Sequence, residues 1–142
     1  MKFISAIVAT VAAASSAVAT TIRYDPVYDN AGQSLATVSC SDGPYGLLTR
    51  GYTTFGSLPQ FPHIGAKEGA SHGTAECGTC YKLYWTDEFG TTRSIHVLAI
   101  DYATSGFNIA QTALDELTGG RAVEKGSIDA TVKQVNVKHC GL

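Results

Sequence analysis

Charged side chains are scarce in this sequence, and no run of one charge sign occurs. Of the 142 residues, ten are Lys or Arg and twelve are Asp or Glu, which gives a formal net charge of −2 at pH 7. Proteins that bind nucleic acid or anionic membrane surfaces rely on clustered basic residues. The sequence therefore predicts neither kind of partner, and its weak charge and seven Tyr residues favour a neutral one.

Long hydrophobic runs are missing as well, except close to the N-terminus. Lys2 precedes an apolar run over residues 3–11, and small residues then lead to an A-x-A ending at Ala19. This pattern is typical of a secretory signal peptide, and the run is too short to span a membrane. We expect cleavage after Ala19, so that residues 1–19 are a signal peptide and residues 20–142 form a single domain.

Cysteine is limited to Cys40, Cys77, Cys80 and Cys140. An even number behind a signal peptide indicates two disulfides, for which three pairings exist. A disulfide stabilises the folded state most when it closes a long loop. This favours Cys40–Cys77 and Cys80–Cys140 over a redox-type loop between Cys77 and Cys80. A zinc site built on three of these cysteines and a histidine is a weaker alternative, because no second C-x-x-C and no H-x-x-x-H accompanies them. We predict no metal and no cofactor.

One stretch carries the strongest signals for local structure. Residues 95–100 are apolar on both strand faces, which is typical of a strand that is covered on both sides, and Asp101 follows them. An unpaired carboxylate is costly to bury, so Asp101 is expected at a rim of the fold. Two interpretations remain open for it, a functional group and a structural acceptor for nearby backbone N–H groups.

A helix is predicted over about residues 108–118. Asn108 is a good N-cap residue, Gln111 has the spacing of a capping box, and two glycines after residue 118 supply a stop.

The rest of the chain contains short strand candidates separated by turns. They lie at residues 21–28 as an extended segment, at 34–40, at the start of 46–65, at 81–85 and 93–101 as a hairpin or two adjacent strands, and at 128–137. Residues 65–79 have the least regular pattern, and a change of parity predicts a β-bulge near Lys133 and Gln134. About six strands and one helix predict a mainly β domain, either a barrel or a sandwich.

Four motifs then resemble the cerato-platanin family. They are YD-x-x-YDN at residues 24–30, CSDG at 40–43, CGTC at 77–80, and VLAID followed by GFNIA within 97–110. The resemblance covers about residues 22–140. It implies a mainly β, six-stranded double-psi β-barrel, similar to the first domain of expansins, with short helical turns. It also implies the disulfides Cys40–Cys77 and Cys80–Cys140.

The family is associated with the fungal cell wall, with binding of chitin-type oligosaccharides, with loosening of cellulose without hydrolysis, and with eliciting plant defence. The resemblance therefore implies a secreted, extracellular fungal wall protein that binds polysaccharide and triggers defence responses in a plant or other host. It implies a monomer with a capacity for self-assembly, and a host receptor as a second kind of partner.

Residue by residue, the resemblance implies a carbohydrate-binding surface that contains Asp42, Asp101 and Asn108. From the residues alone, Asp42 is also explained as a turn former after Cys40. The chain departs from the family where Tyr45 stands in place of the usual Asn, and where S-H-G-T at residues 71–74 replaces W-N-S. Loss of that Trp predicts weaker stacking on chitin, which Tyr45 is expected to replace in part.

The carboxylates also bear on whether the protein cleaves its ligand. A glycosidase needs two of them, and only Asp101 has a position at a strand end. Asp25, Asp29 and Asp42 are possible partners, but each is also explained as a turn residue. One Asp can still act as the acid and base of a lytic-transglycosylase-type cleavage, provided that its pKa is raised. A binder needs only hydrogen-bonding groups such as Asn108 and an aromatic face such as Tyr45 or Tyr52. We predict a non-catalytic binder, with a glycan-cleaving enzyme that uses Asp101 as the alternative.

Overall fold

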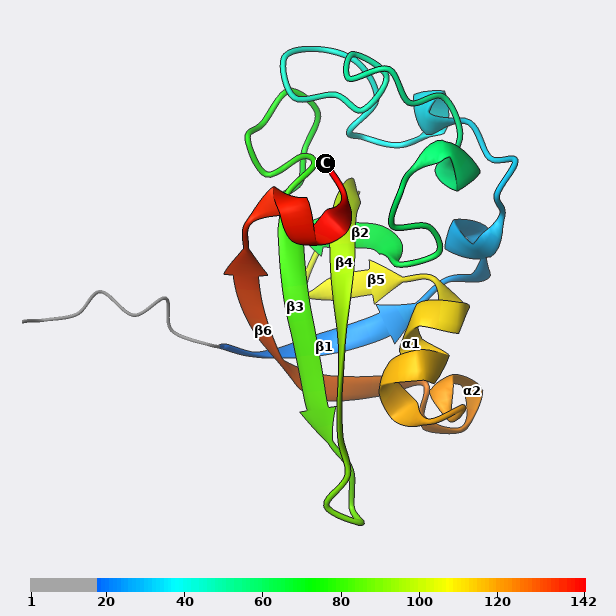
Figure 1. The fold of residues 1–142 in the computed structure, drawn as a ribbon, viewed down its shortest axis with the longest axis vertical. Coiled ribbons are helices and arrows are strands. Elements are labelled where there is room, and N and C mark those ends of the chain that lie inside the picture. Colours follow the sequence, from blue (N-terminus) through cyan, green and yellow to red (C-terminus); the bar gives the residue numbers. More distant parts are fainter. Residues whose placement is uncertain (1–17) are drawn as a thin grey trace, which may run out of the picture.

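The computed structural model describes residues 18–142, in which six strands close into a barrel (Figure 1). The strands are β1 (Val18–Tyr24), β2 (Ile64–Glu68), β3 (Cys80–Thr86), β4 (Thr92–Ala103), β5 (Phe107–Ile109) and β6 (Ser127–Val135). Around the barrel their order is β1-β5-β2-β4-β3-β6, and β6 pairs with β1 to close it. The mainly β prediction is confirmed, and the barrel is the correct alternative. The signal-peptide prediction lies largely outside the described residues, and its expected cleavage point after Ala19 falls within β1.

Two parallel pairings, β1 with β5 and β2 with β4, set the register on which the site depends. Arg23 lies opposite Asn108 across β1 and β5, and Ala66 of β2 lies opposite both Asn108 and Asp101. The register of β2 against β4 shifts between Gly65 and Ala66. Because paired residues share a face of a sheet, Arg23, Asn108, Ala66 and Asp101 form one row across four strands. We call them the outer row.

The barrel interior explains why that row faces outward. Alternate residues of each strand point inward, and in β5 these are Phe107 and Ile109, both fully or almost fully buried. The Phe107 ring packs edge-on against Tyr81 of β3 at a centroid distance of 5.2 Å. Asn108 lies between the two inward residues, so its side chain belongs to the outer surface.

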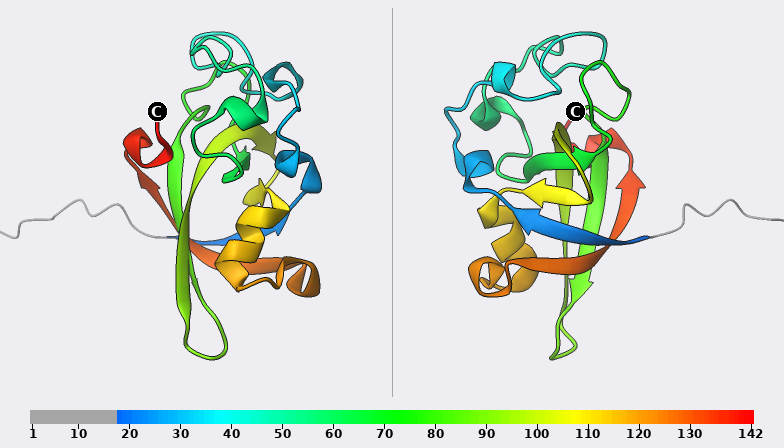
Figure 2. Two further views of the ribbon diagram at one scale, coloured as in Figure 1. Left: turned by 45° about the vertical axis from the view of Figure 1, so that its right-hand side comes forward. Right: turned by 180° about the vertical axis from the view of Figure 1, so that it is seen from behind.

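Long loops and short 3₁₀ turns cover one end of the barrel, and the β3–β4 hairpin projects from the other end (Figures 1 and 2). The hairpin prediction is confirmed by the antiparallel pairing of β3 with β4. Its turn is fixed by Asp87, whose carboxylate accepts hydrogen bonds from the backbone N–H groups of Phe89 and Thr91, both at 2.9 Å. Of the helices within residues 18–142, none is long and apolar enough to cross a membrane.

Three expectations for individual strands are wrong. Residues 34–40 contain a 3₁₀ turn, Leu35–Thr37, because the Ser34 hydroxyl accepts a hydrogen bond from the Ala36 backbone and starts a turn. Residues 46–63, where a strand was expected at the start, form turns and a short 3₁₀ segment, Phe55–Ser57. Residues 65–79, which were expected to be the least regular, instead begin within strand β2. No bulge occurs near Lys133, because β6 keeps its register against β3 up to Val135 and ends there.

The helix prediction is correct in type and wrong at its start. Helix α1 runs over Gln111–Thr118, and Asn108 belongs to β5. The N-cap is supplied from elsewhere in the chain. The Asp29 carboxylate accepts hydrogen bonds from the backbone N–H groups of Gln111 at 2.8 Å and Thr112 at 3.0 Å. A negative charge at this end also suits the helix dipole.

Replacing Asp29 tests the long-range cap. Asp29→Ala leaves two N–H groups at the start of α1 without an acceptor, and we expect it to lower the free energy of unfolding by about 1 kcal/mol. Urea denaturation followed by circular dichroism measures this change. Asn108→Ala is the control, because it removes the residue that the local sequence favours as the cap. A larger decrease in the free energy of unfolding for Asn108→Ala than for Asp29→Ala would contradict the assignment of Asp29 as the cap of α1.

Both predicted disulfides are present, Cys40–Cys77 and Cys80–Cys140. All four sulfur atoms are therefore bonded, which excludes the zinc alternative. Cys40–Cys77 joins the loops that cover the barrel, and Cys80–Cys140 fixes the C-terminal 3₁₀ turn, Val137–Cys140, to the start of β3.

Candidate functional site

Asp101 lies in β4, two residues before the strand ends, and its carboxylate is held by the covering loops. The Tyr28 hydroxyl donates a hydrogen bond to Oδ2 at 2.8 Å. Oδ1 accepts hydrogen bonds from the backbone N–H groups of Ser39 at 3.0 Å and Tyr102 at 2.9 Å. Burial, followed by the charge of Asp101 and the hydrogen bond to it, raises the pKa of Tyr28 far above its ordinary value. The Tyr28 hydroxyl therefore keeps its proton and remains a donor.

Asn108 lies in the same outer row, with Ala66 between it and Asp101. The side-chain oxygen of Asn108 is buried and has no hydrogen-bond partner among the described residues. A buried acceptor without a donor costs about 1–3 kcal/mol. Such a group next to a groove can accept a hydrogen bond from a water molecule or a ligand.

A groove of about 450 Å³ runs along this part of the surface. Its lining residues come from β1, from β5 and from the end of β4 with the loop that follows: Arg23, Asn108, Tyr102, Ala103, Thr104 and Ser105. Asp101 is not part of the groove lining, and its carboxylate is bonded to Tyr28 and Ser39. The register places Asp101 and Asn108, two of the five predicted site residues, in one row with Ala66 between them, and Asn108 connects that row to the groove.

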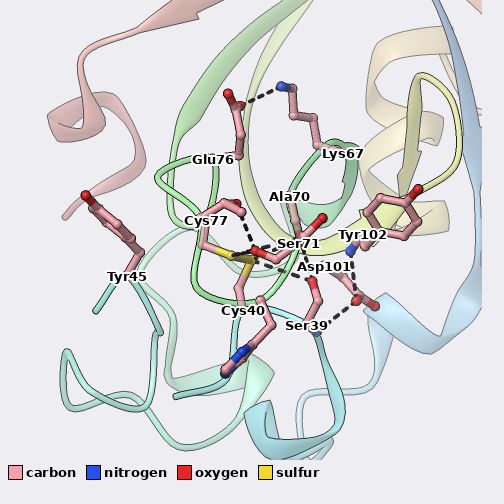
Figure 3. The surroundings of a disulfide bond; sticks show 12 residues. Ser39, Cys40, Tyr45, Lys67, Ala70, Ser71, Glu76, Cys77, Asp101 and Tyr102 are labelled. Atoms are coloured by element: carbon pink, nitrogen blue, oxygen red, sulfur yellow. Dashed lines mark hydrogen bonds and ion pairs between the residues drawn. A yellow bond between two sulfur atoms is a disulfide. The ribbon is translucent and has the colours of Figure 1, made fainter. Parts of the chain in front are cut away.

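Asp42 and Tyr45 lie in a separate area. Figure 3 shows Tyr45 and Asp101 on opposite sides of the Cys40–Cys77 disulfide. The Asp42 carboxylate pairs with His72 Nε2 at 2.5 Å, and this hydrogen bond and the charge of His72 hold the pKa of Asp42 below its ordinary range. His72 belongs to the segment that replaces W-N-S. Here it partners a carboxylate, and Tyr45, 42% exposed, is the aromatic side chain open to solvent.

Tyr52 is partly buried and packs against the hydrophobic core, so it does not offer an open ring face. The structure supplies a different aromatic group beside Asp101 and Asn108. Tyr102 lines the groove and is 50% exposed. Sequence reasoning missed both Tyr102 and Arg23. For Arg23 the available signal was parity, because it directly follows the buried Ile22 in β1. For Tyr102 parity gives no signal, because it directly follows Asp101 and alternation places their side chains on opposite faces.

The chemistry of this arrangement is that of hydrogen bonding and ring contact. The groove offers a guanidinium, an amide, two hydroxyls and a phenol ring. No cluster of three or more His, Cys, Asp or Glu side chains suited to a metal ion occurs in residues 18–142. Open grooves with these groups are suited to a polar ligand that also has apolar ring faces.

Comparison with known proteins identifies the family. The cerato-platanin family model matches residues 20–142. The chain belongs to the cerato-platanin family. The allergen Asp f 15 homolog of Arthroderma benhamiae is 48% identical over 123 residues, which cover 84% of this chain and 57% of that protein. The chain therefore spans little more than half the length of this relative.

Solved cerato-platanin structures have the same fold. Cerato-platanin 1 from M. perniciosa superposes with a TM-score of 0.83 at 41% identity, over 86% of this chain and 99% of the other. The solution structure of the fungal elicitor cerato-platanin gives a TM-score of 0.72 at 36% identity, over 84% of this chain and 95% of the other. The predicted barrel, helix and disulfides are thus those of a cerato-platanin.

Proposed function

We propose that this protein binds polysaccharide, of the chitin or cellulose type, at the groove beside the outer row and loosens it without hydrolysis. The observation that carries this proposal is the alignment of Asp101 and Asn108 in one row next to an open groove with an exposed Tyr102 ring. Carboxylate and amide groups exchange hydrogen bonds with sugar hydroxyls, and an aromatic ring packs on the apolar face of a pyranose.

Binding is favoured over cleavage by the surroundings of Asp101. Its two oxygen atoms accept three hydrogen bonds from Tyr28, Ser39 and Tyr102. A general acid must instead hold a proton and deliver it to the ligand. A two-carboxylate glycosidase also needs a second acid beside the first. Asp42 is paired with His72 in a separate area, the Asp29 carboxylate caps α1, and the Asp25 carboxylate accepts a hydrogen bond from the Val27 backbone N–H. The enzyme that uses Asp101 alone remains the alternative.

Loosening follows from weak binding at many places on a polymer. In a shallow groove, desolvation of hydroxyl groups offsets much of each hydrogen bond, so that each contact contributes only about 0.5–1.5 kcal/mol. Contacts of this strength form and break readily along an insoluble polymer. They compete with chain–chain hydrogen bonds and leave the glycosidic bonds intact.

A companion role in host recognition is part of the proposal. Related proteins are named as an allergen homolog and as a fungal elicitor. Two disulfides are typical of proteins in oxidising, extracellular compartments. We infer a secreted protein of the fungal wall that also elicits defence responses through a host receptor, acting as a monomer that is capable of self-assembly.

The first test is binding and product release on insoluble chitin and cellulose. We expect the protein to be depleted from solution, with no soluble oligosaccharide in the supernatant by mass spectrometry. Asp101→Asn is expected to reduce the bound fraction about fivefold through loss of a charged acceptor, with the fold intact by circular dichroism.

Asp129→Asn, a change at a carboxylate on β6 that accepts a hydrogen bond from Thr21, is the matched control and should bind as the parent does. Release of oligosaccharides with free reducing ends would contradict a non-hydrolytic role. Anhydro-sugar ends would support the enzyme that uses Asp101 alone. Equal binding by the Asp101 variant would make that carboxylate purely structural.

A further inference from the structure

Arg23 differs from the other three arginines in its surroundings. Arg93 and Arg121 pair with Asp87, and Arg50 donates hydrogen bonds to two backbone carbonyl groups. Arg23 is exposed, lines the groove, and has no carboxylate partner within residues 18–142. Its one hydrogen bond there is a long contact of 3.5 Å to the Ser105 carbonyl oxygen. The guanidinium is therefore available to a ligand at the edge of the groove.

Asn108 presents a second donor beside Arg23. The two residues are direct partners in the β1–β5 ladder and share the outer face. The Asn108 amide oxygen is buried without a donor, and the amide nitrogen makes no hydrogen bond within the described residues. The nitrogen is not among the buried atoms that lack a partner, so at least part of its surface is accessible. The groove thus contains two adjacent free donors, one of them charged.

Two adjacent donors, one of them a guanidinium, match a ligand group with two acceptor oxygens and a negative charge. A carboxylate has this geometry, and arginine binds it through two parallel N–H···O contacts. Next to them, Tyr102 offers a half-exposed ring, and Thr104 and Ser105 contribute hydroxyl groups. A ligand that satisfies all of these groups has a carboxylate on a hydroxylated ring.

We propose that the groove also accepts a hexuronate unit and prefers a polysaccharide that contains such units to the neutral chains of chitin and cellulose. The carboxylate of the sugar pairs with Arg23 and the Asn108 amide N–H, and the ring lies on Tyr102. This inference rests on the proposed polysaccharide binding and names the chemical class of the polymer.

The Asp101 carboxylate is the nearest charge in the outer row that opposes this assignment. Ala66 separates it from Asn108, and Arg23 lies beyond Asn108, so the guanidinium is three strands away from it. Three donors from Tyr28, Ser39 and Tyr102 already solvate the Asp101 charge. The Asp101 carboxylate and the carboxylate of the bound sugar therefore lie at different ends of the row, and each has its own hydrogen-bond donors.

The test compares oligogalacturonate with its methyl ester, which keeps the sugar backbone and removes the charge. In calorimetric titrations of the oxidised protein we expect the free acid to bind about tenfold more tightly than the ester. Arg23→Gln should abolish this difference, and Asn108→Asp, which brings a carboxylate to the same position, should weaken binding of the acid further. Lys133→Gln is the matched control, because it removes a positive charge from an exposed residue of β6 outside the groove.

Each outcome separates this inference from the proposed function. Equal affinity for acid and ester, or an equal loss in the Lys133 and Arg23 variants, would overturn selection of a uronate and leave polysaccharide binding in place. Absence of binding to the acid, the ester, chitin and cellulose would overturn both. An acid preference that depends on Arg23 but not on Lys133 would support both.

Discussion

Removal of both disulfides is expected to unfold the barrel at room temperature. Cys40–Cys77 and Cys80–Cys140 close loops with sequence separations of 37 and 60 residues. In the chain-entropy model, each closure of this length stabilises the folded state by about 4 kcal/mol. The two loops do not overlap along the chain, so their contributions are close to additive, and about 8 kcal/mol is comparable to the whole stability of a typical domain.

Paired alanine variants measure the two contributions separately. We expect the free energy of unfolding, measured by urea denaturation, to fall by about 4 kcal/mol in the Cys40→Ala/Cys77→Ala protein and in the Cys80→Ala/Cys140→Ala protein. The quadruple variant should have the circular dichroism spectrum of an unfolded chain in buffer. Reduction of the parent protein with a thiol reagent should give the same unfolded spectrum. A cooperative folding transition in the quadruple variant would show that core packing alone maintains the barrel.

Gly65→Ala is expected to have the second largest effect on stability, and to lower the free energy of unfolding by about 3 kcal/mol or more. A Cβ atom at this position would lie 2.6 Å from the Ile109 Cα atom and in contact with the Asn108 carbonyl oxygen. These are backbone atoms of the neighbouring strand, so the clash is relieved only if β2 and β5 separate. The same movement would displace Asn108 and Asp101 from the outer row, so ligand binding should fall together with stability.

Gly32→Ala is the control for this substitution. A Cβ atom there would approach only the Asn30 side-chain oxygen, at an ordinary distance of 3.6 Å, and the backbone needs no left-handed conformation. We expect its urea midpoint to stay close to that of the parent protein. If both alanine variants are equally stable, the close approach of β2 to β5 at Gly65 is not a constraint.

The sequence predicted the parts of the fold that local patterns determine. Residues 95–100 are apolar on both faces because β4 lies between the barrel interior and the covering loops, where Ile100 and Val97 are both fully buried. The hairpin and the stop after α1 were also predicted correctly, since Gly119 adopts the left-handed conformation at φ 70° that ends the helix.

Errors arose where a distant segment decides the local structure. Asn108 has the residue type of a helix cap, but pairing with β1 and β2 places it in a strand. Asp29, 82 residues before Gln111, caps the helix instead. The segment around Leu35 has alternating apolar residues, but it pairs only at an isolated bridge of Ser34 with Thr54, and the Leu35 side chain packs in the core from a 3₁₀ turn. Single-sequence patterns contain no information on such partners.

Only part of the candidate site was predicted, because the rest of it also depends on contacts between distant segments. Asp101 and Asn108 entered through their motifs, and the β2 strand that lies between them brings them together. Arg23 and Tyr102 stand outside those motifs, and only the register of β1 against β5 and the course of the chain after β4 give them a common groove. Tyr52 looked equivalent to Tyr45 in sequence, yet the core takes up one ring and leaves the other exposed.

The order of the cysteines has a consequence for how the molecule survives proteases. The disulfides make two consecutive covalent rings, residues 40–77 and 80–140, joined only through Gly78 and Thr79. A single cut inside either ring leaves every fragment attached. A cut at the connection would part the rings, but Gly78 N–H donates to the Ala99 carbonyl and Ala99 N–H donates to that of Thr79. The joint between the rings is thus held against β4, and a molecule cut inside either ring keeps its fragments covalently linked.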